Sequence, residues 1–387
     1  MLKFHSLRIA ELHPEAQDAI ALSLEVPEAL RQEYLGQAGQ HVVLRAELEG
    51  QEVRRTYSLV SSPAEWPLRI VARVHDRGRM SRFLAEQLRA GDRIDVLPPN
   101  GSLTPHLSAQ DAGKTYVAFA AGCGITPVLA ILKAVLQAHP ANQAILVYGN
   151  TSTDRSMCLE ELLALKDRHV QRLALHFVMS REPQEVELYN GRVDGDRVRE
   201  FARVLLRAPE IAEYFVCGPG DMIDRVSAVL RELGVRAERI HGEHFTVRSV
   251  STEDPAPGVA GKAPVGQSLQ PQVAEEQKPG SGSETGGREA PDTQTAEVTV
   301  LMDGRRRTFT MKMNDDTVLD AAARAGLDLP FSCRAGVCST CRTKVLSGKV
   351  EMDQNYALED WELEQGYILA CQSRVLTPTL ELDYDEK

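Results

Sequence analysis

Long hydrophobic runs are scarce in this chain. One uncharged stretch, Tyr116 to Leu132, approaches the length of a membrane span, but the glycines and proline of GCGITP interrupt it. These residues fit a turn between a buried strand and a helix better than a membrane helix. The N-terminal segment MLKFHSLRIAELHPEAQ contains two His, one Arg and two Glu residues before any apolar run, which is unlike a secretory signal. We therefore expect no membrane association and a cytoplasmic location.

Basic stripes are also missing. The formal net charge is −11 and the isoelectric point is near 5.5, so the chain lacks the positive surface that phosphate backbones require. This argues against nucleic-acid binding. The 387 residues are enough for two or three domains of ordinary size. Such domains have sizeable hydrophobic cores and need no covalent cross-links.

Cysteine is sparse, with seven residues in the whole chain. In a cytoplasmic chain we expect free thiols or metal ligands rather than disulfides. Four of the seven lie between Cys333 and Cys371. A metal centre in the last quarter of the chain is the simplest interpretation of this clustering.

Hydrophobic residues nearly vanish between Thr252 and Gln294. These 43 residues include no aromatic residue, no Ile and one Leu, so the segment cannot bury enough apolar surface to order itself. It is predicted to be a flexible tether with a root-mean-square span of roughly 35 Å. The segments that it joins should fold separately.

The remaining sequence divides by its periodicity. Short alternating runs in the first hundred residues, such as HVVLRAEL, RRTYSLV, LRIVARV and DRIDVLPP, favour an antiparallel β-barrel. From Lys114 onward, strands TYVAFAA, AILVYGN, LALHFVMS and YFVCGP alternate with helices, which indicates βαβ units around a parallel sheet. We place a barrel domain at 1–107, an α/β domain at 108–248, a linker at 249–295 and a C-terminal domain at 296–387.

The C-terminal domain shows two local signals. VTVLMDGRRRTFTMK reads as a hairpin that turns at Asp303-Gly304. A helix should begin near Thr317, with Asp320 three residues later as the acid of a capping box and Gly326 as the stop.

The strongest motif is the cysteine spacing. Cys333, Cys338 and Cys341 form C-x4-C-x2-C, and Cys371 follows about thirty residues later, which is the spacing of plant-type [2Fe–2S] sites. Three thiolates can come from one tight loop and the fourth from a distant element. The small residues between them allow backbone N–H groups to turn toward the sulfurs. Zinc is the alternative, but zinc sites commonly use two short C-x2–4-C pairs and this chain has one.

The C-terminal segment resembles plant-type ferredoxins from Ala296 to Lys387, including LPFSCRAGVCSTC and ILACQS. That resemblance implies an α+β β-grasp fold around the cluster. A lone ferredoxin only carries electrons, so the preceding domains must explain where they come from.

Two motifs in the barrel point to a flavin. Arg55-Thr56-Tyr57-Ser58 lies in an expected strand, and about twenty residues later RGRMS opens a helix whose amides would favour a pyrophosphate. These residues resemble the ferredoxin–NADP reductase superfamily. The resemblance implies that Arg55 neutralises the FAD pyrophosphate, Tyr57 stacks on the isoalloxazine and Ser58 hydrogen-bonds near its reactive nitrogen. It also implies phosphate-side roles for Gly78, Met80 and Ser81.

The α/β domain carries the matching nicotinamide motifs. The turn GCGITP follows a strand and opens a helix, which suits the phosphates of a dinucleotide. In the superfamily this motif binds the nicotinamide cofactor, which implies binding roles for Gly122, Gly124, Thr126 and Pro127. The same resemblance places Cys217 and Gly218 beside the nicotinamide.

The resemblance also suggests roles near the end of this domain. HGEHF resembles the terminal acidic and aromatic strand near the flavin, which makes Glu243 a catalytic candidate beside Ser58 and Cys217, and Phe245 a cofactor-binding candidate. Ser180-Arg181 follows a strand where the family often reads the ribose 2′-phosphate, so we expect NADPH, with NADH possible. Cys123 departs from the motif, where a small Ser, Thr or Ala is usual.

We expect NADPH, FAD and [2Fe–2S] to act in that order in a reductase that serves an oxygenase. Motifs including FHSLRIAEL, AGCGITPVLAIL and NYALEDWELEQGYILACQS are similar to the reductase subunits of multicomponent phenylacetyl-CoA epoxidases. That similarity implies diiron oxygenase subunits as partners and a role in phenylacetate catabolism. Reductases of Rieske-type or steroid-ring hydroxylases share these motifs and stay open as alternatives. A non-enzymatic iron–sulfur redox sensor would be expected to have lost Arg55, Ser58 or GCGITP.

Overall fold

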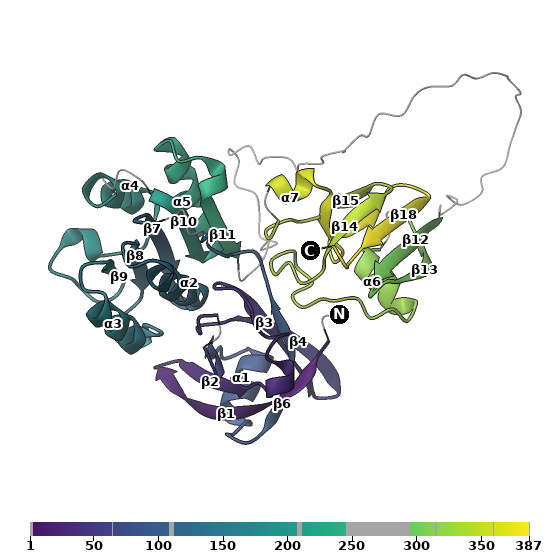
Figure 1. The fold of residues 1–387 in the computed structure, drawn as a ribbon, viewed down its shortest axis with the longest axis horizontal. Coiled ribbons are helices and arrows are strands. Elements are labelled where there is room, and N and C mark those ends of the chain that lie inside the picture. Colours follow the sequence, from purple (N-terminus) through teal and green to yellow (C-terminus); the bar gives the residue numbers. More distant parts are fainter. Residues whose placement is uncertain are drawn as a thin grey trace, which may run out of the picture. The chain divides into compact units, whose positions relative to one another are not determined.

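The structure is a computed structural model, which describes residues 3–63, 65–107, 112–206, 211–244, 295–313, 316–358 and 360–386. The chain divides into two compact units between Val250 and Ser251. The first, here called the reductase unit, contains a barrel and an α/β domain (Figure 1). The second, the cluster unit, contains the four grouped cysteines. Residues 249–294 of the expected linker lie outside the described residues.

Six antiparallel strands form the first domain, in the order β4-β3-β6-β1-β2-β5. Just after β4, Leu59 forms a bridge to Ile70 on β5 and thereby joins the two ends of the sheet. This closure produces the expected barrel, whose interior contains fully buried side chains such as Leu22, Leu44 and Val96. Its elements are β1 (His5–Ala16), β2 (Ala19–Glu25), β3 (His41–Leu48), β4 (Gln51–Ser58), β5 (Leu68–Arg73), α1 (Arg79–Glu86) and β6 (Arg93–Asn100), with a 3-10 turn at Glu28–Leu30.

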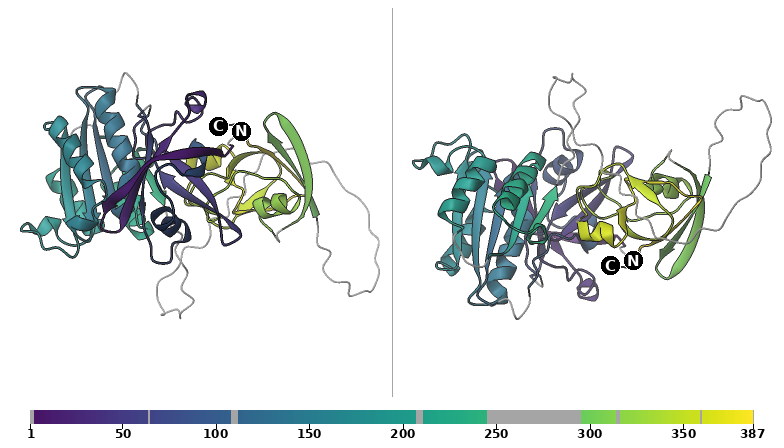
Figure 2. Two further views of the ribbon diagram at one scale, coloured as in Figure 1. Left: turned by 90° about the horizontal axis from the view of Figure 1, so that it is seen from below. Right: turned by 90° about the horizontal axis from the view of Figure 1, so that it is seen from above.

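The second domain is a parallel sheet in the order β11-β10-β7-β8-β9, with helices on both faces (Figures 1 and 2). Apolar residues of α2 and α3 pack on one face, and those of α4 and α5 pack on the other. The strands are β7 (Thr115–Ala121), β8 (Gln143–Asn150), β9 (Leu173–Met179), β10 (Ile211–Gly218) and β11 (Ile240–His244). The helices are α2 (Ile125–Ala138), α3 (Leu159–Arg168), α4 (Gly195–Val204) and α5 (Gly220–Glu232). Short 3-10 turns occupy Gly122–Gly124, Thr153–Arg155, Glu187–Tyr189 and Ala237–Arg239.

Buried ion pairs join the barrel to the α/β domain. Lys133 on α2 is almost fully buried, and its ammonium donates to the Val60 carbonyl at 2.9 Å and to Glu65 at 3.2 Å, both in the barrel. The same ammonium lies 2.6 Å from Glu161 on α3, which also pairs with Arg69 of the barrel at 3.1 Å. Because buried charges are stable only when paired, these contacts fix how the two domains meet.

The cluster unit has a mixed five-stranded sheet in the order β13-β12-β18-β14-β16, crossed by α6 (Val318–Arg324). β12 (Thr295–Met302) and β13 (Arg305–Lys312) form the expected hairpin, with positive φ at Asp303 and Gly304. Thr317 caps α6 by accepting the Asp320 N–H, as the capping-box pattern predicts. The remaining elements are β14 (Arg342–Ser347), β15 (Val350–Met352), α7 (Asp360–Glu364), β16 (Tyr367–Leu369), β17 (Ser373–Val375) and β18 (Thr379–Asp383).

Among the residues described, every helix is too short or too polar to cross a lipid bilayer. The uncharged stretch from Tyr116 to Leu132 is instead β7, a 3-10 turn and the first half of α2.

Candidate flavin, nicotinamide and cluster sites

The expected flavin residues lie on β4 and at the start of α1. Ser58 ends β4 and is buried, and its hydroxyl oxygen has no hydrogen-bond partner within the described chain. Tyr57 is half-buried beside it, and burial raises the pKa of its phenol above the ordinary value. Arg55 is exposed and donates to the Arg54 carbonyl at 2.7 Å.

The helix start keeps its first turn compact. Gly78 precedes α1, and a Cβ there would lie 2.3 Å from the Ser81 hydroxyl oxygen, so a larger residue would push into the turn. Ser81 accepts the His75 N–H at 3.2 Å, and Met80 is buried in the barrel core. Free amides at such a helix start can receive phosphate oxygens.

The GCGITP turn runs directly from β7 into α2. Gly122 has φ of +54°, which favours glycine, and Thr126 donates to the Cys123 carbonyl at 2.9 Å. Thr126 and Pro127 are buried in the first turn of α2. A Cβ on Gly124 would lie 2.0 Å from the Cys217 carbonyl oxygen, so only glycine allows the turn after β7 to approach the end of β10 this closely. The turn thereby holds Cys217 beside the start of α2.

Cys217 and Glu243 are directly opposed on the parallel strands β10 and β11. The Cys217 thiol donates to the Glu243 carbonyl at 3.4 Å, and Gly218 follows it at the end of β10. Burial raises the pKa of Cys217 well above its ordinary value, and the nearby Glu243 carboxylate adds to this effect. The thiol is therefore protonated and uncharged at neutral pH.

His41 is a residue that the sequence reasoning missed. It is fully buried on β3, pairs in register with Ser58, and places Nδ1 3.1 Å from Glu243 Oε1. The structure thus brings Ser58, His41, Glu243 and Cys217 together from four strands. The one signal in the sequence for a role of His41 is its position in a predicted strand. That position does not identify Glu243, 202 residues away, as its partner.

Two orphaned atoms test whether this constellation fits a flavin. Ser58 Oγ and Glu243 Oε2 are both buried and both lack a hydrogen-bond partner among the described residues. Buried polar atoms are rarely left so, because each costs about 1–3 kcal/mol. A polar ring system between barrel and sheet would satisfy them, so the residues present fit FAD.

Ser180 and Arg181 follow β9, and their N–H groups bond to the carbonyls of Asn150 and Thr151, both at 2.9 Å. The Arg181 side chain is exposed, and among the described residues it forms no ion pair. Its neighbour Glu182 is engaged elsewhere, accepting from the Thr153 N–H at 2.6 Å and the Thr153 hydroxyl at 2.7 Å. Arg181 is thus available for a solute phosphate.

The cluster cysteines converge in the second unit. The loop that carries Cys333, Cys338 and Cys341 turns through positive φ at Arg334, Gly336 and Ser339. The Ala335 N–H donates to Cys333 Sγ at 3.4 Å, and Gln372 Nε2 lies 3.7 Å from Cys371 Sγ. The thiols meet in pairs, Cys333 with Cys338 and Cys341 with Cys371. Two pairs of sulfurs with inward-facing amides fit a two-iron cluster.

These neighbours change the acidity of the thiols. The hydrogen bond from Cys338, helped by the N–H groups of Val337 and Ala335, lowers the pKa of Cys333 to about 6 in spite of burial. The Cys341 thiol similarly lowers the pKa of Cys371, while the pKa of Cys341 itself is raised. Thiolates are the form that binds iron.

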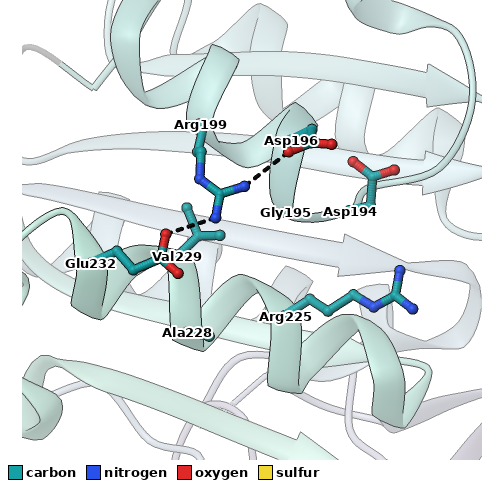
Figure 3. Close-up of a pocket in the computed structure, with 8 residues that line it drawn as sticks. All are labelled: Asp194, Gly195, Asp196, Arg199, Arg225, Ala228, Val229 and Glu232. Carbon is teal, nitrogen blue, oxygen red and sulfur yellow. Dashed lines mark hydrogen bonds and ion pairs between the residues drawn. The ribbon is translucent and has the colours of Figure 1, made fainter. Parts of the chain in front are cut away.

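Phe245, the remaining candidate, lies outside the described residues. A surface hollow between α4 and α5 contains none of the expected site residues (Figure 3). There Arg199 bridges Asp196 at 2.9 Å and Glu232 at 2.7 Å. This charged helix contact stabilises the α/β domain and offers no flavin or nicotinamide site.

Three family models match successive parts of the chain. Residues 6–104 match an oxidoreductase FAD-binding domain, residues 119–228 an oxidoreductase NAD-binding domain, and residues 300–376 a 2Fe-2S iron-sulfur cluster binding domain. Their order follows the barrel, the parallel sheet and the cluster unit. FAD, NAD(P)H and a [2Fe–2S] cluster are the cofactors of these domains.

Relatives match over the entire chain. A component of the 1,2-phenylacetyl-CoA epoxidase of Escherichia coli (strain K12) is 36% identical over 387 residues, covering 100% of this chain and 99% of that protein. The ferredoxin reductase component of 3-ketosteroid-9-alpha-monooxygenase from Rhodococcus rhodochrous is 32% identical, covering 98% and 96%. Among solved structures, phthalate dioxygenase reductase has the same fold, with a TM-score of 0.54 at 20% identity and 98% of both chains covered.

Proposed function

Because this chain belongs to the ferredoxin–NADP reductase superfamily with a C-terminal ferredoxin domain, we propose that it supplies electrons from NADPH to a phenylacetyl-CoA epoxidase. It is an NAD(P)H-dependent reductase component of a multicomponent oxygenase. The observation that supports phenylacetyl-CoA epoxidation as the pathway is the full-length similarity to the epoxidase component. We further propose a diiron oxygenase as the electron acceptor.

FAD accepts a hydride and releases electrons singly, and a [2Fe–2S] cluster carries them one at a time. We propose that Ser58 and Glu243 use their orphaned oxygens to orient the isoalloxazine ring. Cys217 would hold the nicotinamide face against it without introducing charge, because its thiol stays protonated. Tyr57 would cover the other face of the flavin, and Arg55 would neutralise the pyrophosphate.

The phosphates of the two cofactors would be held by backbone amides. Gly78, Met80 and Ser81 at the start of α1 are proposed for FAD. The turn at Gly122 and Gly124, with the first turn of α2, is proposed for the nicotinamide dinucleotide.

The cluster would be held by two sulfur pairs. We propose that Cys333 and Cys338 bind one iron and that Cys341 and Cys371 bind the other, in keeping with their pairwise contacts. The Ala335 N–H and the Gln372 amide would then stabilise the sulfur charge.

We propose NADPH rather than NADH as the better substrate. An exposed guanidinium without an ion-pair partner among the described residues suits a ribose 2′-phosphate, and Arg181 meets that requirement. Losing one such charge-assisted contact costs about 1.5–3 kcal/mol. Arg181→Ala should therefore raise the KM for NADPH by roughly 10- to 100-fold and leave the KM for NADH unchanged. Equal use of both nucleotides by the wild type would contradict the assignment.

Docking on the oxygenase should be electrostatic. From Ala296 to Lys387 there are 16 Asp or Glu residues against 11 Lys or Arg. A net charge of −5 suits a basic patch on the partner and a transient, salt-sensitive complex. Electron delivery should therefore slow as ionic strength rises.

The pathway is tested by reconstitution. This chain is mixed with the candidate diiron oxygenase, NADPH, oxygen and phenylacetyl-CoA, and the epoxide is followed. Coupled product formation supports the proposal. Oxidation of NADPH without product, together with coupling to a steroid-ring hydroxylase, would favour the second candidate, which the 32% full-length similarity to the ketosteroid reductases supports.

A further inference from the structure

A buried carboxylate lies between two imidazoles at the edge of the parallel sheet. Glu213 on β10 accepts the His106 backbone N–H at 3.0 Å through Oε2. Its Oε1 lies 3.2 Å from His241 Nε2 on β11 and contacts His106 Nδ1. One donor atom from each residue lies within 4.8 Å of the others. We propose that His106, Glu213 and His241 bind a divalent transition metal ion, with Zn²⁺ the best match to the donors.

The donor set and spacing suit zinc. Two imidazoles and one carboxylate are ligands that zinc prefers, and bonds of about 2.0–2.1 Å place tetrahedral donors about 3.3 Å apart. The separation between His241 Nε2 and Glu213 Oε1 is already 3.2 Å. His106 is 78% exposed, so its ring can move back to a similar spacing. The fourth position would then face solvent on the His106 side.

Charge also favours a cation here. The Glu213 side chain is 9% exposed, and a buried carboxylate needs compensation. In the part of the chain that the structure describes, its ion-pair partners are the two histidines, and no lysine or arginine pairs with it. A divalent ion bound here would place positive charge directly beside this buried carboxylate.

The three proposed ligands come from separate segments of the chain. His106 lies in the connector after β6, whereas Glu213 and His241 lie on adjacent parallel strands. The His241 ring stacks on Phe215 at 5.4 Å between centroids. Bound metal would tie the connector to the β10–β11 edge and should stabilise the reductase unit by mass action.

The test uses the full chain with flavin and cluster loaded, equilibrated with Zn²⁺ at buffered free concentrations. Bound zinc is measured by elemental analysis, and its ligands by X-ray absorption at the zinc edge. The wild type should bind one zinc per chain through nitrogen and oxygen at about 2.0–2.1 Å. His106→Ala and Glu213→Gln should each lower the affinity about tenfold or more. His13→Ala, which removes an exposed histidine elsewhere on the barrel, should bind zinc like the wild type.

Thermal unfolding provides the second measurement. Zinc should raise the Tm of the reductase transition in the wild type and in His13→Ala, but not in His106→Ala. The proposal is overturned if His106→Ala and Glu213→Gln bind zinc as the wild type does, or if none of the proteins binds it. A zinc shell of sulfur at about 2.3 Å would overturn it too, because that places the ion on cysteines.

Discussion

Both units of this protein bury thiols, yet the cluster unit lowers the pKa of two of them, Cys333 and Cys371, while the pKa of Cys341 is raised. In the reductase unit Cys158 and Cys217 are buried and Cys123 is half-buried, and burial raises the pKa of all three. In the cluster unit three of the four cysteines are equally buried, but the pKa of Cys333 and of Cys371 is lowered. Burial alone therefore does not explain the difference in pKa between the cysteines of the two units.

The difference lies in what each thiol contacts. Cys158 and Cys217 pack in the apolar core between the sheet and α2, where the neutral thiol is favoured. The cluster cysteines contact one another and backbone N–H groups, which favour thiolates. One residue type thus has the proposed role of an uncharged wall in one unit and of metal ligands in the other.

The largest effect should follow from breaking the cluster unit alone. Cys338→Ser removes one of the four proposed iron ligands, so transfer to a one-electron protein acceptor should fall to background. Hydride transfer from NADPH to the flavin should continue, because the flavin residues belong to the other unit. Stopped-flow bleaching of the flavin and reduction of a protein acceptor measure the two steps. Loss of both steps in a correctly folded variant would show that the units do not act separately.

The second prediction concerns a substitution in the reductase unit that should slow flavin reduction and leave the cluster intact. Cys217→Ala removes the thiol that donates to the Glu243 carbonyl and opens space beside the proposed nicotinamide position. We expect the rate of flavin reduction to fall roughly 10- to 100-fold, equivalent to about 1.4–2.7 kcal/mol, while the visible spectrum of the cluster stays unchanged.

Cys158→Ala is the matched control, since Cys158 is equally buried but lies at the start of α3, where its backbone N–H donates to Glu15. It should leave the rate of flavin reduction nearly unchanged. Equal losses in the two variants would mean that Cys217 matters only for packing.

Local patterns explain why much of the fold could be predicted. The strand written as HVVLRAEL is β3 residue for residue, because its valines and leucines favour a strand. Its first four residues are buried on both faces. The turn at Asp303-Gly304 and the cap at Thr317 depend on neighbours only a few residues away. The cluster cysteines are similarly evident because three of them lie within nine residues.

The site residues that were missed depend on long-range geometry. His41 reaches Glu243, and Lys133 reaches Glu65, only because the barrel and the sheet meet in one particular way. Nothing in the local sequence of either residue specifies that arrangement. The first two strands, His5–Ala16 and Ala19–Glu25, carry weaker alternation, since two register shifts interrupt their pairing.

The third change removes a buried charge from the reductase unit. Lys133→Met should destabilise that unit by about 2–3 kcal/mol, below the usual cost of breaking a buried pair because Glu65 and Glu161 remain partly exposed. In calorimetry the reductase transition should move to lower temperature and the cluster transition should not. Arg82→Met, which breaks an exposed pair on α1, should leave both transition temperatures nearly unchanged. A matching shift of both transitions would contradict independent units.

The smallest expected effect is the pH dependence of the stability that Glu65 contributes. Burial alone would raise the pKa of Glu65, but hydrogen bonds from Ser62 and the Lys133 ammonium lower it below the ordinary 4.5. A carboxyl group whose pKa is lower in the folded state stabilises that state when the pH is above the ordinary pKa. This stabilisation is lost as the pH falls through the pKa of the group in the folded state. Glu65→Gln should therefore lower the Tm of the reductase transition at pH 7, and its deficit against the wild type should shrink below about pH 4.5. Because the carboxylate is 37% exposed, screening should keep the effect under about 1 kcal/mol.

Glu86→Gln, on the exposed face of α1, serves as the control. A deficit that stays constant from pH 7 to pH 4 would show that Glu65 contributes through shape rather than charge.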